Sequence, residues 1–327
     1  MREWYTQYET ITSYTGNNTE VIVPSSINSR QIDTIGDYAF SPEKYKLKPG
    51  HVECRRNIKK IIISEGIKGI NDHAFDGCLN LESISIPDSL RYIGAYAFKD
   101  CSSLKTFDFR SSRGGAGMFE GCEALETVTS LKATSTDMFC GCLSLKNIVL
   151  PDDLRVLSCG TFLHCESLKS IDIPSSVKEI GNNCFCECKS LTDVHIPDGV
   201  TEIESSLFRR CENLVNVRLP ANLKTIHQWA FARCSSLEVI DIPENVEKFR
   251  SDVFRDCNSL KRVIIRGAQT MIEDDHRYNR IRSGKQIIEY IPLPDESDFP
   301  KGIEIVGIKG SFAEEYAKKY DMKFTEL

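Results

Sequence analysis

The chain has 327 residues, 41% of them hydrophobic and 27% charged, which is the composition of an ordinary folded protein. Its formal net charge of −6 argues against nucleic acid as the main partner, because phosphate binding needs a concentrated basic face. No run of about 18 apolar residues occurs, so no membrane span is predicted, and the first residues, MREWYTQYET, lack a signal-peptide pattern.

Residues 1–35 are predicted to form an N-terminal cap and a first strand. Val21 and Val23 alternate with other residues, which favours a strand. Pro24 then ends the strand, because proline has no N–H to donate to a neighbour.

An insertion at residues 41–57 holds most of the basic cluster in this acidic chain. We interpret it as a solvated loop, and the alternative is a contact surface for an acidic partner. The basic residues of this region are Lys44, Lys46, Lys48, Arg55, Arg56, Lys59 and Lys60.

Residues 36–266 repeat with a dominant period of 23 residues. In nearly every unit a cysteine follows a phenylalanine by three residues, and a leucine follows the cysteine by three more. The phenylalanines are Phe40, Phe75, Phe98, Phe119, Phe139, Phe162, Phe185, Phe208, Phe231 and Phe254. The cysteines are Cys78, Cys101, Cys122, Cys142, Cys165, Cys188, Cys211, Cys234 and Cys257.

The consensus unit reads C-x-x-L-x-x-I-x-I-P-x-x-V-x-x-I-x-x-x-A-F-x-x. The I-x-I pair predicts a short strand, V-x-x-I a second extended or turning segment, and A-F-x-x-C a compact turn. One unit is too small to bury its own apolar face, so neighbouring units must stack. The sequence therefore predicts a mainly β protein with few helices, a right-handed leucine-rich-repeat solenoid of about ten units.

The recurring cysteine is predicted to be a packing residue. Stacked side chains point in parallel, which disfavours disulfide geometry, and zinc needs ligands that converge on one point. Free cysteine behaves as a small apolar side chain that is very often buried. The local run CFCEC, residues 184–188, resembles a metal motif, but Cys186 is expected to point away from Cys184 and Cys188.

Two units, between residues 101 and 139, are shorter than the others. The first contains Gly114, Gly115 and Gly117, but this run follows no β-branched strand and precedes no helix. It is therefore not a phosphate-binding loop, and we interpret it as a flexible shortcut.

Residues 267–327 leave the repeat and are predicted to form a C-terminal cap. Ser311 and Glu314 fit a capping box, and Phe312, Tyr316 and Lys319 would lie along one face of a short helix.

The repeat pattern, together with YTGNNTEVIVPSSI near the start and GIKGSFAEEYAKKYDMKF near the end, resembles the BspA-like leucine-rich repeats of the LRR_5 type. The resemblance implies a surface protein of anaerobic gut or oral bacteria, or of parasitic protists, that adheres to host proteins or other microbes. It implies no catalytic motif. The absence of a signal-peptide pattern leaves a cytosolic location open.

No catalytic residue, cofactor or metal site is predicted, because the six histidines fall at different repeat positions and no nucleophile or phosphate motif occurs. Binding is the more plausible activity. Alternate residues of the I-x-I strands face outward, and we expect them to line a concave face. The candidate strip consists of Asp172, His195, Arg218 and Asp241.

The first hypothesis is a non-enzymatic, monomeric interaction module, extracellular or on the cell surface by resemblance, that binds a host or microbial protein. The alternative is a carbohydrate-binding or carbohydrate-processing accessory protein, which would need exposed aromatic rings or paired carboxylates on one face. A third reading is a structural spacer with a featureless face.

Overall fold

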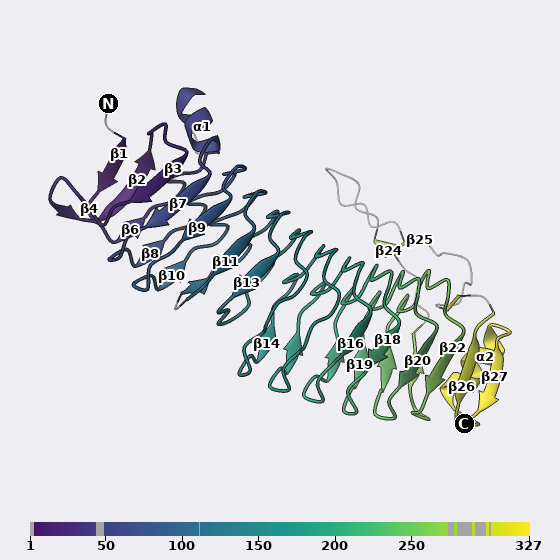
Figure 1. The fold of residues 1–327 in the computed structure, drawn as a ribbon. Coiled ribbons are helices and arrows are strands. Elements are labelled where there is room, and N and C mark those ends of the chain that lie inside the picture. The colour runs from purple at the N-terminus through teal and green to yellow at the C-terminus, as the bar shows by residue number, and fades with distance from the viewer. Residues whose placement is uncertain are drawn as a thin grey trace. The chain divides into compact units, whose positions relative to one another are not determined.

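The computed structural model describes residues 3–43, 49–110, 112–273, 278–279, 290–291, 299–300 and 302–327 (Figure 1). The predicted basic residues Lys44, Lys46 and Lys48, and most of the segment 274–298, lie outside the described residues. The described chain is mainly β with two helices, as predicted, and it divides into two compact units, Met1–Leu191 and Thr192–Leu327.

The I-x-I positions, continued by two strands after the repeat, form one row of strands in each unit, and each strand pairs in parallel with at least one neighbour in its row. In unit 1 the strands of this row are β3 (Glu20–Val23), β7 (Lys60–Ile63), β9 (Ser83–Ser85), β11 (Thr106–Asp108) and β13 (Thr127–Thr129). In unit 2 they are β16 (Asp193–His195), β18 (Asn216–Arg218), β20 (Val239–Ile242), β22 (Arg262–Ile265), β26 (Glu304–Gly307) and β27 (Lys323–Glu326).

The V-x-x-I segments form a second row of short parallel strands. Their inward residue is the second isoleucine of the consensus or its replacement, which is buried in every strand of the row except β12 and β23, where Gly114 and Ile272 are partly buried. In unit 1 the row comprises β6 (Thr34–Ile35), β8 (Gly69–Ile70), β10 (Tyr92–Ile93), β12 (Arg113–Gly114), β14 (Val156–Leu157) and β15 (Glu179–Ile180). In unit 2 it comprises β17 (Glu202–Ile203), β19 (Thr225–Ile226), β21 (Lys248–Phe249) and β23 (Met271–Ile272).

The remaining elements lie outside these two rows. At the start, β1 pairs antiparallel with β2, which joins β6 in parallel, and β4 pairs antiparallel with β5. Their bounds are β1 (Trp4–Gln7), β2 (Thr10–Tyr14), β4 (Ser26–Ile27), β5 (Arg30–Gln31), α1 (Pro49–Arg56), β24 (Tyr278–Asn279), β25 (Tyr290–Ile291) and α2 (Phe312–Lys319).

The A-F-x-x-C turn is held by hydrogen bonds to the next repeat rather than by a helix. In one repeat the N–H groups of His73, Phe75 and Gly77 donate to carbonyl oxygens one repeat later, at 2.8–2.9 Å. Residues two before and two after the phenylalanine adopt positive φ, as at His73 (54°) and Gly77 (74°). This costs a residue other than glycine about 1 kcal/mol or more, and the hydrogen bonds between repeats offset it.

The core of each unit consists of stacked side chains from equivalent repeat positions. The phenylalanine rings from Phe40 to Phe185 in unit 1, and from Phe208 to Phe254 in unit 2, are fully buried. Neighbouring rings lie 4.9–5.7 Å apart in the pairs that span one period, such as Phe75–Phe98 and Phe231–Phe254. Phe299, which lies outside the repeat, continues the second stack at 5.6 Å from Phe254.

The recurring cysteines are buried. All fourteen cysteines lie in the described part of the chain, and none of them forms a disulfide bond. The recurring cysteines do more than fill space, however. The Sγ of Cys188 donates to the carbonyl oxygen of Phe162 in the preceding repeat at 3.2 Å, and Cys257 does the same to Phe231 at 3.0 Å. The same contact is made by Cys78, Cys101, Cys122, Cys142, Cys165 and Cys234.

The glycine run is not a flexible shortcut, which corrects the sequence prediction. Gly114 belongs to β12, which pairs in parallel with β10. A Cβ atom on Gly115 would lie 2.6 Å from the backbone nitrogen of Ala95. A Cβ atom on Gly117 would lie 2.2 Å from the ring of Tyr96. These glycines are therefore required for close packing between repeats.

The described part of the basic insertion is also different from the predicted solvated loop. Residues Pro49–Arg56 form helix α1, and Arg55 is fully buried. Its guanidinium donates to the carbonyl oxygens of Tyr14, Tyr38 and Ser41 at 2.9, 3.2 and 2.6 Å, and to the Ser13 hydroxyl. Burial lowers the pKa of Arg55 to about 10, which still leaves it charged at neutral pH.

Helix α2 begins as the sequence predicts. The Oγ of Ser311 accepts from the N–H of Glu314 at 3.4 Å, and a Glu314 carboxylate oxygen accepts from the N–H of Gly310 at 2.6 Å. No described helix has the length and apolar character required to cross a bilayer.

Candidate functional site

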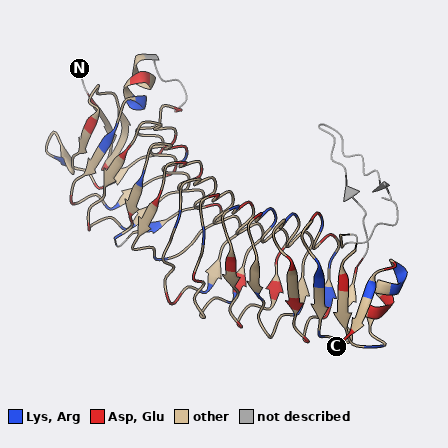
Figure 2. Ribbon diagram, turned by 45° about the vertical axis from the view of Figure 1, so that its right-hand side comes forward, with Lys and Arg blue, Asp and Glu red and all other residues tan. Residues whose placement is uncertain are grey.

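The strand strip, defined here as the outward residues of the I-x-I strands, is a regular surface of unit 2. Parallel pairing places His195 of β16 directly beside Arg218 of β18, and both are exposed. Asp193 and Asn216 are paired in the same way and are joined by a hydrogen bond between their side chains. Figure 2 shows that acidic and basic residues both occur along the strands of this unit.

The side chains of His195 and Arg218 are both exposed. Both side chains are polar or charged. Within the described part of the chain, neither makes a hydrogen bond or an ion pair. The two residues lie on neighbouring paired strands. Because the paired backbone is rigid, less conformational entropy is lost when their side chains bind a partner.

Asp241 differs from these two residues. Its carboxylate is held by Arg266, whose Nε and Nη2 lie 2.7 and 2.6 Å from the two oxygens. Because both carboxylate oxygens accept from Arg266, the negative charge of Asp241 on β20 is neutralised. Sequence reasoning missed the pair because Arg266 lies just beyond the end of the strand.

Asp172 belongs to unit 1, whereas the other three predicted residues belong to unit 2. It is exposed, lies outside any strand, and has no side-chain partner among the described residues. The structure thus brings His195 and Arg218 together, places Asp241 in an ion pair, and leaves Asp172 in a different unit.

The end of the strip is a network of ion pairs. Glu304 of β26 accepts from Arg262 at 2.8 Å, from Lys323 at 2.8 Å and from the Thr325 hydroxyl at 2.6 Å. Hydrogen bonds from Lys323, then Thr325 and Arg262, lower the pKa of Glu304 to about 2. Its charge is therefore internally satisfied, in contrast to the charge on Arg218.

The apolar residues exposed on the first row of strands are aliphatic, whereas the second row exposes Tyr92 of β10 and Met271 of β23. Ile22 is 65% exposed and Val239 is 46% exposed, and Val149, at the equivalent repeat position, is 83% exposed. The described strands of this row in unit 2 carry no exposed tryptophan, tyrosine or phenylalanine. Stacking of a sugar ring on an aromatic face therefore has no platform here.

The rings of Tyr38, His73 and Tyr96 stack on one another in unit 1. The ring of His73 lies between those of Tyr38 and Tyr96, with centroids 4.7 and 5.1 Å away. Its Nδ1 is 2.8 Å from a carboxylate oxygen of the buried Asp76, whose pKa is raised mainly by burial. The ring faces are covered, so this cluster is structural rather than a ligand platform.

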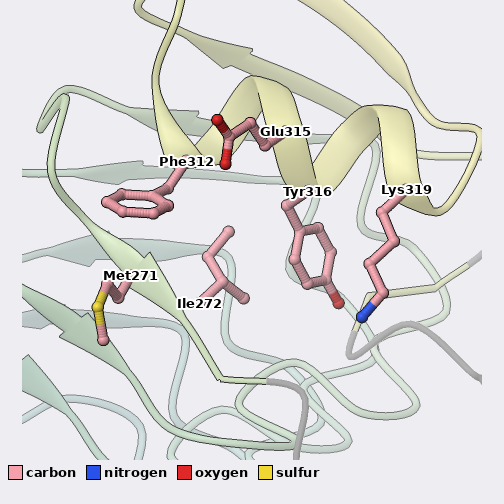
Figure 3. A pocket seen from close by; sticks show the side chains of 6 residues that line it. All are labelled: Met271, Ile272, Phe312, Glu315, Tyr316 and Lys319. Carbon is pink, nitrogen blue, oxygen red and sulfur yellow. The ribbon is translucent and has the colours of Figure 1, made fainter.

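A pocket of about 280 Å³ lies between β23 and helix α2. Figure 3 shows Phe312 and Tyr316 on the same side of the helix as Lys319, with Met271 and Ile272 opposite. Phe312 and Met271 are 41% and 45% exposed, whereas Tyr316 is buried. The pocket is open and mainly apolar, with Glu315 completing its lining.

Sequence reasoning also missed two groups of possible metal ligands. One consists of Glu202, Glu204 and His227 in unit 2, and the other consists of His164, Glu166 and Glu187 in unit 1. In each group the ligand atoms lie within 4.8 Å of one another. The signal that would have revealed them is a histidine and a glutamate 23 residues apart, because the period places such residues side by side.

The fold is shared with solved bacterial proteins. A leucine-rich repeat protein from Bacteroides ovatus is 21% identical, with a TM-score of 0.52, and the alignment covers 99% of this chain and 97% of that one. The pneumococcal vaccine antigen PcpA is 18% identical, with a TM-score of 0.59, and 97% and 92% of the chains are covered. A comparison with curated proteins finds no match.

The family model described as "BspA type Leucine rich repeat region" matches six copies, over residues 51–167 and 155–280. These ranges together cover more than half of the chain, and the repeat that they match is the one that builds both units. The chain therefore belongs to the BspA type leucine-rich repeat family.

Proposed function

We propose that the chain is a non-enzymatic protein-interaction module on the surface of a bacterial cell or secreted from it. In this proposal the strand strip of unit 2 binds a partner protein of the host or of another microbe. The observation that carries it is the exposed pair His195 and Arg218, held in neighbouring rungs without side-chain partners in the described chain. Family membership supports the surface location, because bacterial surface proteins are typical of this family.

The composition of the strip supports a protein partner over a glycan. It combines uncommitted charge at Arg218 with exposed aliphatic area at Val239, and the described strands of this row in unit 2 present no exposed aromatic face. Protein interfaces are commonly built from such a mixture, in which charge steers the encounter and apolar area contributes affinity. Sugar-binding sites, in contrast, usually stack the ring on an aromatic side chain.

The proposal is tested by reversing the charge of Arg218. The purified chain and its Arg218→Glu variant are compared on an array of purified extracellular host proteins and surface proteins of other microbes. We expect at least one saturable partner, and we expect the substitution to weaken its affinity by roughly tenfold or more, because an interfacial arginine would become repulsive. Raising the salt concentration should weaken the wild-type interaction.

Lys224→Glu is the matched control, because it makes the same charge change in the same unit. Lys224 precedes β19 in the other row of strands, and its ion pair with Glu247 is exposed. This variant should retain the affinity of the wild type. Equal affinities for all three proteins would remove the strand strip from the proposal, and binding of glycans but of no protein would favour the carbohydrate alternative.

A further inference from the structure

A group of three metal-ligating side chains lies on the second row of strands in unit 2. Glu202 belongs to β17, and Glu204 follows that strand by one residue. The register pairs Ile203 with Ile226, so the next residues, Glu204 and His227, are neighbours in adjacent repeats. The His227 Nε2 lies 2.8 Å from a carboxylate oxygen of Glu202, and the ligand atoms of all three residues lie within 4.8 Å of one another.

Apart from the contact of His227 with Glu202, the two carboxylates have no basic partner among the described residues. No described lysine or arginine forms an ion pair with Glu202 or Glu204. Further along the same row, Glu273 accepts from both Lys248 and Arg250. Arg250 stands one repeat after His227, and its guanidinium pairs with Glu273 at 3.1 Å.

The similar group in unit 1 shows the contrast. His164, Glu166 and Glu187 have the same ligand types and the same spacing limit of 4.8 Å. There, however, the ammonium of Lys189 lies 2.7 Å from a carboxylate oxygen of Glu166. A lysine already supplies positive charge to that group, whereas the group in unit 2 has two carboxylates and an imidazole with no such partner.

We propose that Glu202, Glu204 and His227 form a binding site for Zn²⁺. One imidazole and two carboxylates are a ligand set that zinc accepts, and three protein ligands leave a fourth position for water or for a donor from another molecule. Tetrahedral bonds of about 2 Å place ligand atoms about 3.3 Å apart, so modest side-chain rotations close the site. The paired strands fix the three backbones, which favours a preformed site.

The site is tested by titrating the full chain, stripped of metal with a chelator, with ZnCl₂ in a calorimeter. The Cys159→Ser background is used, because Cys159 is an exposed thiol that would bind zinc independently. We expect one zinc ion per chain and, for His227→Ala or Glu204→Gln, an affinity roughly tenfold or more weaker. Circular dichroism checks that each variant is folded.

His164→Ala is the matched control, and it should bind zinc as the parent does. Substitution by Co²⁺ provides a second readout, because nitrogen and oxygen ligands give visible bands without the intense thiolate charge-transfer band. The proposal is overturned if the parent binds no zinc, if His227→Ala binds as well as the parent, or if the Co²⁺ spectrum shows thiolate ligation. It does not depend on a protein partner, so it can fail or succeed separately from the proposed function.

Discussion

At the level of single residues, the recurring cysteine shows how one side chain serves both packing and hydrogen bonding. Its burial follows from the repeat pattern, which predicts a small apolar residue in the core. Its donation to a phenylalanine carbonyl oxygen of the preceding repeat, 3.2 Å away for Cys188, adds a second hydrogen bond to an acceptor that also receives the N–H of Cys165 at 3.0 Å. The thiol proton is therefore part of the fold.

This role predicts that the protein loses stability at alkaline pH. Burial raises the pKa of Cys257 from 9.0 to about 12. Well below pH 9.0 the thiol is protonated in both the folded and the unfolded chain, so it has no effect on the pH dependence of stability. Above that pH the unfolded chain releases a proton that the folded chain keeps. Each such thiol therefore lowers the free energy of unfolding by at most about 1.4 kcal/mol per pH unit, until the pH reaches the folded pKa.

Urea unfolding between about pH 8 and about pH 10, under reducing conditions, measures this dependence. The Cys257→Ala variant should show a shallower decline than the wild type, because it lacks one of the titrating thiols. Lysine and tyrosine titrate in both proteins and cancel in the comparison. Identical slopes for the two proteins would show that this thiol does not carry the effect.

At the level of elements, helix α1 is attached to the start of unit 1 through one buried side chain. The sequence predicts a solvated basic loop because Arg55 stands in a cluster of positive residues. The backbone nevertheless places its guanidinium against carbonyl oxygens of Tyr14 and Ser41, which have no other charged donor nearby in the described structure. The guanidinium group carries five N–H donors in a fixed planar fork, so it can reach several carbonyl groups at once.

Arg55→Ala is therefore expected to lower the free energy of unfolding by about 3 kcal/mol or more, because it leaves several buried carbonyl groups without donors. Arg56→Ala is the control from the adjacent position. Arg56 is exposed and pairs with Glu43 at 3.3 Å, an interaction worth less than about 1 kcal/mol. Chemical denaturation compares the two variants. Equal losses, or a neutral Arg55→Ala, would contradict the structural role assigned to α1.

At the level of the whole molecule, each repeat contacts mainly its immediate neighbours, and the chain divides into units Met1–Leu191 and Thr192–Leu327. In such arrays stability is approximately a sum of repeat and nearest-neighbour terms. A severe defect in one repeat should therefore spread to adjacent repeats and weaken with distance along the chain.

Leu237→Asp tests this expectation in unit 2. Leu237 is fully buried, and an unpaired charge at that position costs several kcal/mol. Hydrogen exchange should show lost protection in the repeats around residue 237 and retained protection in the first repeats of unit 1. Val239→Asp, two residues away at a position 46% exposed, should leave exchange nearly unchanged. Uniform loss throughout the chain would contradict the nearest-neighbour account.

Much of the fold follows from the sequence. The period fixes which residues stack, so the phenylalanine, cysteine and leucine positions and the parallel strands are all predicted from local pattern and the need to bury apolar area. The Ser311 cap of α2 is likewise a local signal, and the structure contains it, although the Glu314 carboxylate accepts from the N–H of Gly310 and not from that of Ser311 as in a full capping box.

The tertiary structure decided what depends on residues in different repeats or outside the repeat. It turned Arg55 inward, committed Asp241 to Arg266, and made Gly115 a packing requirement rather than a flexible link. It also placed His227 beside Glu204. The physical reason is that these outcomes depend on the distances between side chains of different repeats and on which charged partner lies nearest. The order of residues along the chain does not contain those distances.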